Sequence, residues 1–297
     1  MHKAKTGWFF ITPGLLLLLT VMGYPLAALL VNSTFIYDFA NPRIAREFIG
    51  LQNYIELLRD SRFLVTMGNT AVFTVFAVSI EFVLGMILAL LLNRISIGRR
   101  PMIALLILPT AAMPVAVGLV WRYMYNNEYG IISYFLKEIG LLGPGRIFSK
   151  ALLTDSATAM GAIIATDIWE WTPFLALMLL GGLLSLSKEP FEAAKVDGAS
   201  AWQTFWHVTL PLLRPVIAIG VLIRISDAAK VLDIVYVLTG GGPGNATETA
   251  HLFAYRLNFK AFNMGYGSAQ VVLLSLVVLG VSLILFRSIS EEKEQSV

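Results

Sequence analysis

The residues that could do chemistry in this 297-residue chain are ionisable side chains set in long apolar stretches. One set recurs at i, i+3, i+4 and i+7, a spacing that places its members on one face of a helix. This set consists of Arg224, Asp227, Ala228 and Val231. In the same register, Lys230 and Asp233 point elsewhere. A guanidinium and a carboxylate on one face can hydrogen-bond a polar ligand or pair with other buried charges.

A second set has the same spacing in another apolar stretch and adds two aromatic rings. It consists of Asp167, Glu170, Trp171 and Phe174. An ionisable residue within a membrane helix is a candidate functional residue by default, although many such residues are satisfied structural pairs. The structural alternative is an ion pair of Arg224 with Asp227 or Glu170 that holds two helices together. The sequence leaves both interpretations open.

We expect structural roles for two further charged residues. Glu81 is the only charge in its apolar stretch, and it can pair with an arginine on a neighbouring helix. Arg122 follows Trp121 at the expected outer end of a helix, where a long cationic side chain commonly reaches the membrane interface.

Several kinds of site are excluded by composition. The chain has no cysteine, and its histidines, His2, His207 and His251, lie far apart, so we expect no metal site and no thiol nucleophile. The glycine-rich segment 240–244 is followed by neither Lys-Ser nor Lys-Thr, and we interpret it as a turn that ends the fifth helix. No nucleotide-binding GxxxxGK[ST] motif occurs elsewhere. We therefore expect no catalytic residue, no bound metal and no cofactor in this chain.

The composition is that of an integral membrane protein. Hydrophobic residues make up 57% of the chain, charged residues only 14%, and the mean hydropathy is +0.74. The net charge of +3 is explained by basic residues at cytoplasmic helix ends, so nucleic-acid binding is not expected.

Six membrane-spanning helices are expected in a single domain, 1–297. A helix needs roughly 20 apolar residues to cross the ~30 Å hydrocarbon layer. The stretches of that length are 8–31, 63–92, 101–125, 156–187, 211–237 and 261–287. The fifth has the weakest hydropathy, and the first is too long for a cleavable signal peptide. The basic turn NRISIGRR, 93–100, favours cytoplasmic termini.

The polar segment 188–211 is expected to form a helix, a bend and a second helix outside the bilayer. Pro190 fits the first turn of a helix, and Gly198 can end it. A second helix then begins with Ser200 as its cap, runs through AWQTFWHV and stops at Pro211. The plainer alternative is an interfacial amphipathic helix that only stabilises the loop.

This segment resembles the EAA loop of ABC importer permeases. That pattern is EAA, three residues, Gly, nine residues, a β-branched apolar residue, any residue, then Leu-Pro. The matching residues are Glu192, Ala193, Ala194, Asp197, Gly198, Val208, Leu210 and Pro211. Only Val208 departs from the usual isoleucine. The resemblance implies an all-α, type I ABC importer permease fold, in which this loop is the cytoplasmic coupling helix that docks on an ATPase subunit.

Other segments are similar to sugar permeases, in particular to the first permease of the maltose and glycerol-phosphate type. They are 48–58, Asn69 with Thr70, 99–125, WEWTPF at 169–174 and DIVYVLTGGGPGNAT at 233–247. In such permeases the positions matching both ionisable sets line the sugar pocket. The resemblance also implies a bacterial or archaeal cytoplasmic membrane and several partners. These are a second, different permease, two ATPase subunits that bind ATP and Mg, and an extracytoplasmic solute-binding protein.

The expected substrate is a sugar or polyol. Arg224 leaves open an anionic sugar derivative or a glycerol-phosphate-like solute. An ion-coupled secondary transporter could also use intramembrane charges, but it would not need the EAA spacing. A membrane-embedded enzyme would need a nucleophile with a base, or metal ligands, and none stands out.

Overall fold

The computed structural model describes residues 11–41, 43, 46–148 and 150–294. The chain divides into two compact units. The first comprises Met1–Leu64 with Phe253–Val277, and the second comprises Val65–Leu252 with Val278–Val297. The candidate sites described below lie in the second unit.

The first unit begins, within the described residues, with an apolar helix at Ile11–Asn32. It includes the π-helical turn η1, Leu19–Gly23, and α2, Tyr24–Asn32. Its mean hydropathy is 2.2, and none of its most apolar window is buried, as expected for a helix that faces lipid. The first three residues of the predicted span 8–31 lie outside the described part of the chain.

A short β-hairpin follows within the otherwise helical described part of this unit. Strands β1, Phe35–Ile36, and β2, Glu47–Phe48, pair antiparallel. The buried side-chain amide of Asn53 in α3, Gln52–Arg59, donates hydrogen bonds to the carbonyls of Ser33 and Phe35 at 2.9 and 3.0 Å. These bonds satisfy backbone groups that the two-residue strands leave unpaired.

The helices α13, Ala250–Phe259, and α14, Met264–Glu294, contribute residues to both units. Within the first unit, the phenol of Tyr266 in α14 donates a 3.0 Å hydrogen bond to the Asp60 carboxylate. The predicted span 261–287 corresponds to the apolar part of α14, Met264–Leu285.

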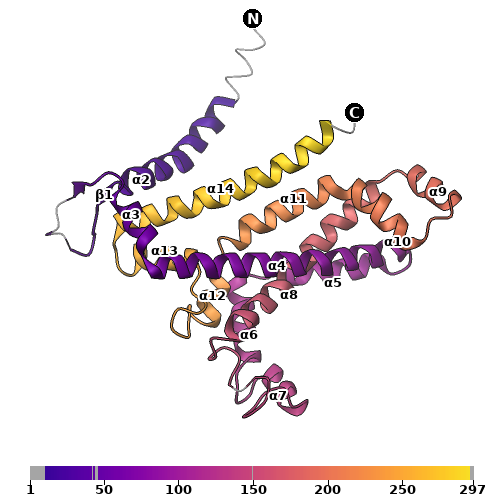
Figure 1. The fold of residues 1–297 in the computed structure, drawn as a ribbon, viewed down its shortest axis with the longest axis horizontal. Helices are drawn as coiled ribbons and strands as arrows, with labels where there is room; N and C mark the ends of the chain where they lie inside the picture. Colours follow the sequence, from indigo (N-terminus) through magenta and orange to yellow (C-terminus); the bar gives the residue numbers. More distant parts are fainter. Residues whose placement is uncertain (1–10, 42, 44–45, 149, 295–297) are drawn as a thin grey trace, which may run out of the picture. The chain divides into compact units, whose positions relative to one another are not determined.

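The second unit is built on long apolar helices. Two of them correspond to predicted spans: α4, Ser61–Arg94, to 63–92 and α8, Ala159–Ser185, to 156–187. The remaining elements are α5, Arg99–Ala111; α6, Pro114–Met124; α7, Ile131–Glu138; α9, Glu189–Val196; α10, Ala201–Thr204; η2, Phe205–Thr209; α11, Leu210–Ala228; and α12, Asp233–Leu238. Helix α8 packs against α5 and α11, and α12 packs against α6 (Figure 1).

The predicted span 101–125 is two helices rather than one. Helices α5 and α6 meet at a bend of 92°. Helix α5 ends at Ala111, and both Ala112 and Met113 are extended. The ring of Pro114 disfavours a helical conformation at Met113, so the helix does not continue directly into α6. Among the described residues, five helices are long and apolar enough to cross a membrane, or six if this bent pair counts as one span.

The predicted span 211–237 has different ends in the structure. A continuous helix runs from Ala201 to Ala228, so Pro211 does not stop it. The π-helical turn η2 lies just before this proline and allows the Leu210 N–H to bond the Phe205 carbonyl five residues back. Such local adjustments let a membrane helix tolerate a proline, which lacks an N–H to donate. At the other end, α11 stops at Ala228 and α12 begins only at Asp233.

A hydrophobic core joins α4, α8 and α11. Its buried residues are Met86, Ala89, Leu92, Leu179, Leu180, Leu183 and Leu213. Small residues let these helices approach closely, as is usual in membrane bundles. A Cβ added at Gly85 would lie 3.1 Å from the backbone nitrogen of Ala176, and one added at Gly182 would lie 3.0 Å from Leu213 and Val216.

Replacing Gly85 by leucine is therefore expected to destabilise the helix contact between α4 and α8, by about 1–3 kcal/mol. The backbone of α8 stands in the way of the new side chain, so the helices must separate. Gly181→Leu is the matched control, because no atom lies within 4 Å of its added Cβ. Thermal unfolding of the purified complex in detergent gives the melting temperatures of both variants. Equal melting temperatures for the two variants would contradict the close packing.

Candidate functional site

A buried cluster of charges joins three helices of the second unit. The Arg224 guanidinium on α11 donates to both carboxylate oxygens of Glu81 on α4, at 2.7 and 2.9 Å. Its Nη2 also donates to Asp167 on α8 at 2.8 Å. None of the three residues is more than 3% exposed. Charge-assisted, bidentate bonds of this kind are strong and fix the relative rotation of the helices.

These pairings show which carboxylates bind Arg224. Glu81 pairs with an arginine on a neighbouring helix, as predicted. The structural alternative named the wrong partners for Arg224, because the salt bridges go to Glu81 and Asp167 instead of Asp227 or Glu170. The guanidinium also lies 4.7 Å from the centre of the Trp171 ring, within the range of a cation–π interaction.

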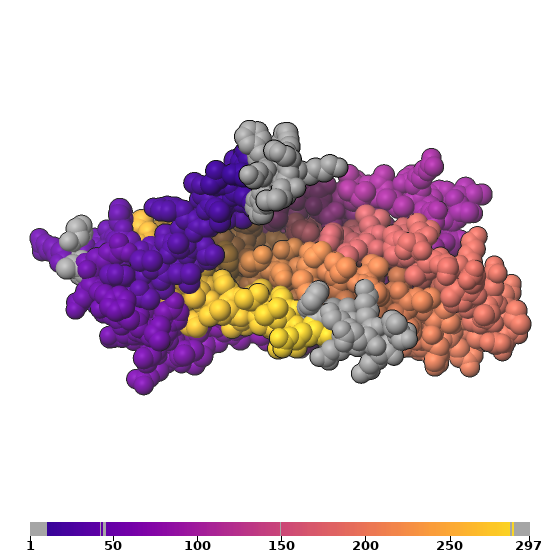
Figure 2. Space-filling model, turned by 90° about the horizontal axis from the view of Figure 1, so that it is seen from above, coloured from indigo at the N-terminus to yellow at the C-terminus, as the bar shows by residue number. Residues whose placement is uncertain are grey.

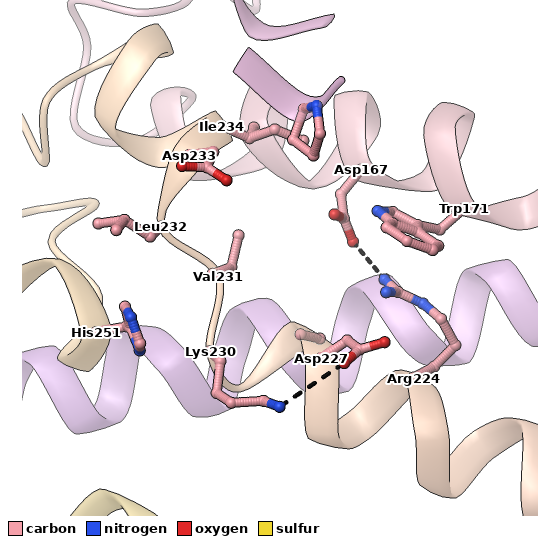
Figure 3. A pocket seen from close by; sticks show the side chains of 12 residues that line it. Asp167, Trp171, Arg224, Asp227, Lys230, Val231, Leu232, Asp233, Ile234 and His251 are labelled. Carbon is pink, nitrogen blue, oxygen red and sulfur yellow. Dashed lines mark hydrogen bonds and ion pairs between the residues drawn. The ribbon is translucent and has the colours of Figure 1, made fainter. Parts of the chain in front are cut away.

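A cavity of about 260 Å³ opens beside this cluster. Figure 3 shows Asp167, Trp171 and Arg224 on one side of it, with Asp227 and Lys230 nearby. The complete lining is Pro114, Asp167, Trp171, Arg224, Asp227, Ala228, Lys230, Val231, Leu232, Asp233, Ile234 and His251. The structure thus brings together, in one cavity, all four predicted residues of the fifth helix and two of the four from the fourth span.

The break between α11 and α12 changes which residues reach the cavity. A continuous helix would turn Lys230 and Asp233 away, as the spacing predicted. Because α11 ends at Ala228, both residues line the cavity instead. Asp233 lies in the first turn of α12, where a negative charge is favoured by the helix dipole. No proline or glycine marks the break, so no local pattern predicted that Lys230 and Asp233 reach the cavity. His251 and Pro114 were not predicted to line it either.

Two predicted residues do not line the cavity. Glu170 is only 1% exposed, and neither of its carboxyl oxygens has a hydrogen-bond partner among the described residues. Phe174 packs edge-on against Trp171, with 6.2 Å between ring centres. Phe174 thus orients the ring that does face the cavity.

The outer part of the cavity carries weaker electrostatic interactions. Lys230 lies 3.8 Å from Asp227, and both side chains are about half exposed. Burial lowers the pKa of His251, the nearby positive charge of Lys230 lowers it further, and Asp233 acts in the opposite direction. The net effect favours the neutral form of the His251 imidazole.

The loop after α12 is held against α4. The side-chain amide of Asn69 donates to the carbonyls of Asn245 and Glu248, both at 3.0 Å. The neighbouring Thr70 hydroxyl accepts from the Ala250 N–H at 2.8 Å. Arg122 has a structural contact as well, since its Nη1 donates to the Val237 carbonyl at 3.1 Å. Together these bonds position the glycine-rich turn and α12 beside the cavity.

The segment 188–211 contains the predicted helix and bend. Helix α9 ends in a Schellman motif: the Gly198 N–H bonds the Lys195 carbonyl at 3.2 Å, and the Ala199 N–H bonds the Ala194 carbonyl at 2.9 Å. Gly198 has a φ of +74°. Glycine adopts this left-handed conformation without steric cost, which explains why a glycine occupies this position. Ser200 then caps the next helix in a capping box with Gln203.

Most residues of the EAA pattern are accessible on this segment. Figure 2 shows that the segment, in the coral part of the colour bar, lies on the surface. Glu192, Ala193, Asp197 and Gly198 are exposed, and Ala194 is half-buried. Small residues on an exposed bend let another helix or surface approach its backbone closely.

The chain is similar in sequence to a family of transport proteins. Residues 82–294 match the family described as "Binding-protein-dependent transport system inner membrane component". The probable ABC transporter permease protein y4oQ of Sinorhizobium fredii is 35% identical over 94% of this chain and 88% of its own length. The trehalose/maltose transport system permease protein MalF of Thermococcus litoralis is also 35% identical, over 95% of this chain and 93% of its own length.

A solved structure has the same fold. It is that of a bacterial ABC transporter involved in the import of the acidic polysaccharide alginate. The matched chain superposes with a TM-score of 0.81, at 21% identity, over 98% of both chains.

Proposed function

The chain belongs to the family of binding-protein-dependent transport system inner membrane components, and from this premise we propose that it is the permease subunit of an ATP-driven importer of a neutral sugar or polyol. The observation that carries the substrate assignment is the cavity beside Arg224. There the Asp167 carboxylate and the guanidinium offer hydrogen-bond partners for hydroxyl groups, and Trp171 offers a ring face for the C–H face of a sugar.

The charge of the cavity favours a neutral substrate over an anionic one. Its lining has three carboxylates and two cations: Asp167, Asp227, Asp233, Arg224 and Lys230. Each cation already faces a carboxylate, since Arg224 is bound by Glu81 and Asp167 and Lys230 lies near Asp227. A phosphate or sulfonate would therefore meet excess negative charge, which costs free energy at short range.

In this proposal the EAA residues of segment 188–211 couple transport to ATP hydrolysis. They are Glu192, Ala193, Ala194, Asp197, Gly198, Leu210 and Pro211. The segment faces the cytosol, as do both termini, and docks on an ATPase subunit that binds ATP and Mg. Closure of two such subunits moves the membrane helices, so the cavity opens to one side at a time. A second permease completes the pathway, and an extracytoplasmic solute-binding protein delivers the substrate.

The proposal is tested by reconstituting the complete importer in vesicles. Labelled trehalose and maltose serve as probes, because a relative is named for these sugars. We expect binding-protein-dependent uptake that requires ATP and stops when the ATPase subunits are inactivated. Uptake driven by a proton or sodium gradient without ATP would instead identify an ion-coupled transporter, and would overturn the proposal.

A further inference from the structure

A second, larger cavity lies away from the charged cluster, between α4 and the segment that carries the EAA residues. Its volume is about 960 Å³. One wall is a run of apolar side chains along α4: Phe82, Val83, Met86, Ile87 and Leu90. The other wall is formed mainly by residues of α9, α10 and η2, including Phe191, Trp202, Phe205 and Trp206. We refer to this cavity as the α4 groove.

The charged residues that line the α4 groove are both basic. Arg94 is the last residue of α4, one turn beyond Leu90, and Lys195 is in the last turn of α9. No acidic side chain is among the described lining residues. The groove therefore combines an apolar wall with two positive charges, one of them at the end of that wall, and this combination is the complement of an anionic amphiphile.

The length of the apolar wall matches one leaflet of a bilayer. Phe82 and Arg94 are twelve residues apart on one helix, a distance of about 18 Å at ~1.5 Å per residue. Half of the ~30 Å hydrocarbon core is about 15 Å. Trp202 and Trp206 also line the groove, and tryptophan is enriched at the level of lipid headgroups.

We propose that the α4 groove binds one anionic phospholipid of the cytoplasmic leaflet, with its phosphate between Arg94 and Lys195 and an acyl chain along α4. Basic pockets next to membrane helices bind such headgroups, and each cation near an anionic lipid contributes to the attraction. The bound lipid contacts both a spanning helix and the segment 188–211. This places it where lipid composition can affect the motion of that segment.

The test measures lipid binding to the complete, delipidated importer by native mass spectrometry. The probes are phosphatidylglycerol and phosphatidylcholine with identical acyl chains. We expect a preference for phosphatidylglycerol of about 25-fold, because two cations each contribute roughly a fivefold gain. Arg94→Gln combined with Lys195→Gln should abolish the preference. Glycerophosphoglycerol, which lacks acyl chains, should not compete.

Arg99→Gln combined with Arg100→Gln is the matched control. It removes the same number of positive charges close to Arg94 in sequence, but neither arginine lines the groove. A photoactivatable phosphatidylglycerol should crosslink to the stretch 82–90 of α4 in the wild type and in this control. Three results would each overturn the proposal: equal binding of the two lipids, a preference that survives loss of Arg94 and Lys195, or crosslinks showing that a helix of the companion permease fills the groove.

Discussion

Replacing Arg224 by methionine is expected to destabilise the protein by about 3–5 kcal/mol, the usual cost of removing one partner from a buried ion pair. The guanidinium makes three short hydrogen bonds to Glu81 and Asp167. Without it, two carboxylates remain buried without a compensating charge. Most of the expected loss comes from these carboxylates, since the bonds themselves add little net stability over an apolar contact.

If the unpaired carboxylates cause the loss of stability, the variants should follow an unusual order of stability. Glu81→Leu leaves the salt bridge of Arg224 with Asp167, so it should cost less than Arg224→Met. The double variant, Glu81→Leu with Arg224→Met, should be more stable than Arg224→Met alone. It removes one of the two carboxylates that Arg224→Met leaves buried without a partner. Unfolding in detergent, followed by tryptophan fluorescence, measures all three variants.

The matched control is Lys230→Ala. Its salt bridge to Asp227 is 3.8 Å long and about half exposed. Such a pair contributes at most about 1 kcal/mol. If Arg224→Met were no less stable than Lys230→Ala, or if the double variant were the least stable of all, the buried cluster would not be the structural centre that we describe.

Replacing Gly198 by valine is expected to lower ATP-dependent uptake about tenfold while leaving the assembled complex in the membrane. The glycine has a φ of +74°, a left-handed conformation that costs other residues about 1–2 kcal/mol and β-branched ones more. Relief of this strain moves the bend between α9 and α10. A change of about 1.4 kcal/mol corresponds to a factor of ten in the population of the native bend.

A comparison of two side chains of similar size makes this test specific to backbone conformation. No atom of this chain lies within 4 Å of a Cβ added at Gly198. Gly198→Asn is the control, because asparagine adopts the left-handed conformation more readily, and it should retain most of the uptake. The measurements are the initial rate of uptake and the ATP hydrolysed per molecule transported. If Gly198→Val had the wild-type rate of uptake and the wild-type ATP cost per molecule, the bend at Gly198 would have no role in energy coupling.

The sequence by itself determined the class of the protein and the local geometry around Gly198 and Ser200, although not the end of the second helix at Pro211. Length and hydropathy identified the apolar helices, because each helix satisfies its own backbone and needs only a stretch of suitable length. Gly198 and Ser200 were recognised as a helix end and a cap because these motifs depend on neighbouring residues only.

Only the tertiary structure decided which charges meet. Glu81 and Arg224 are 143 residues apart in the chain, and their contact depends on the rotation and depth of two separate helices. No local pattern contains that information. The break after Ala228 was also invisible in the sequence, which has no proline or glycine at that point. The packing of α12 against α6 is a long-range contact, and the lining of the cavity is completed by that arrangement.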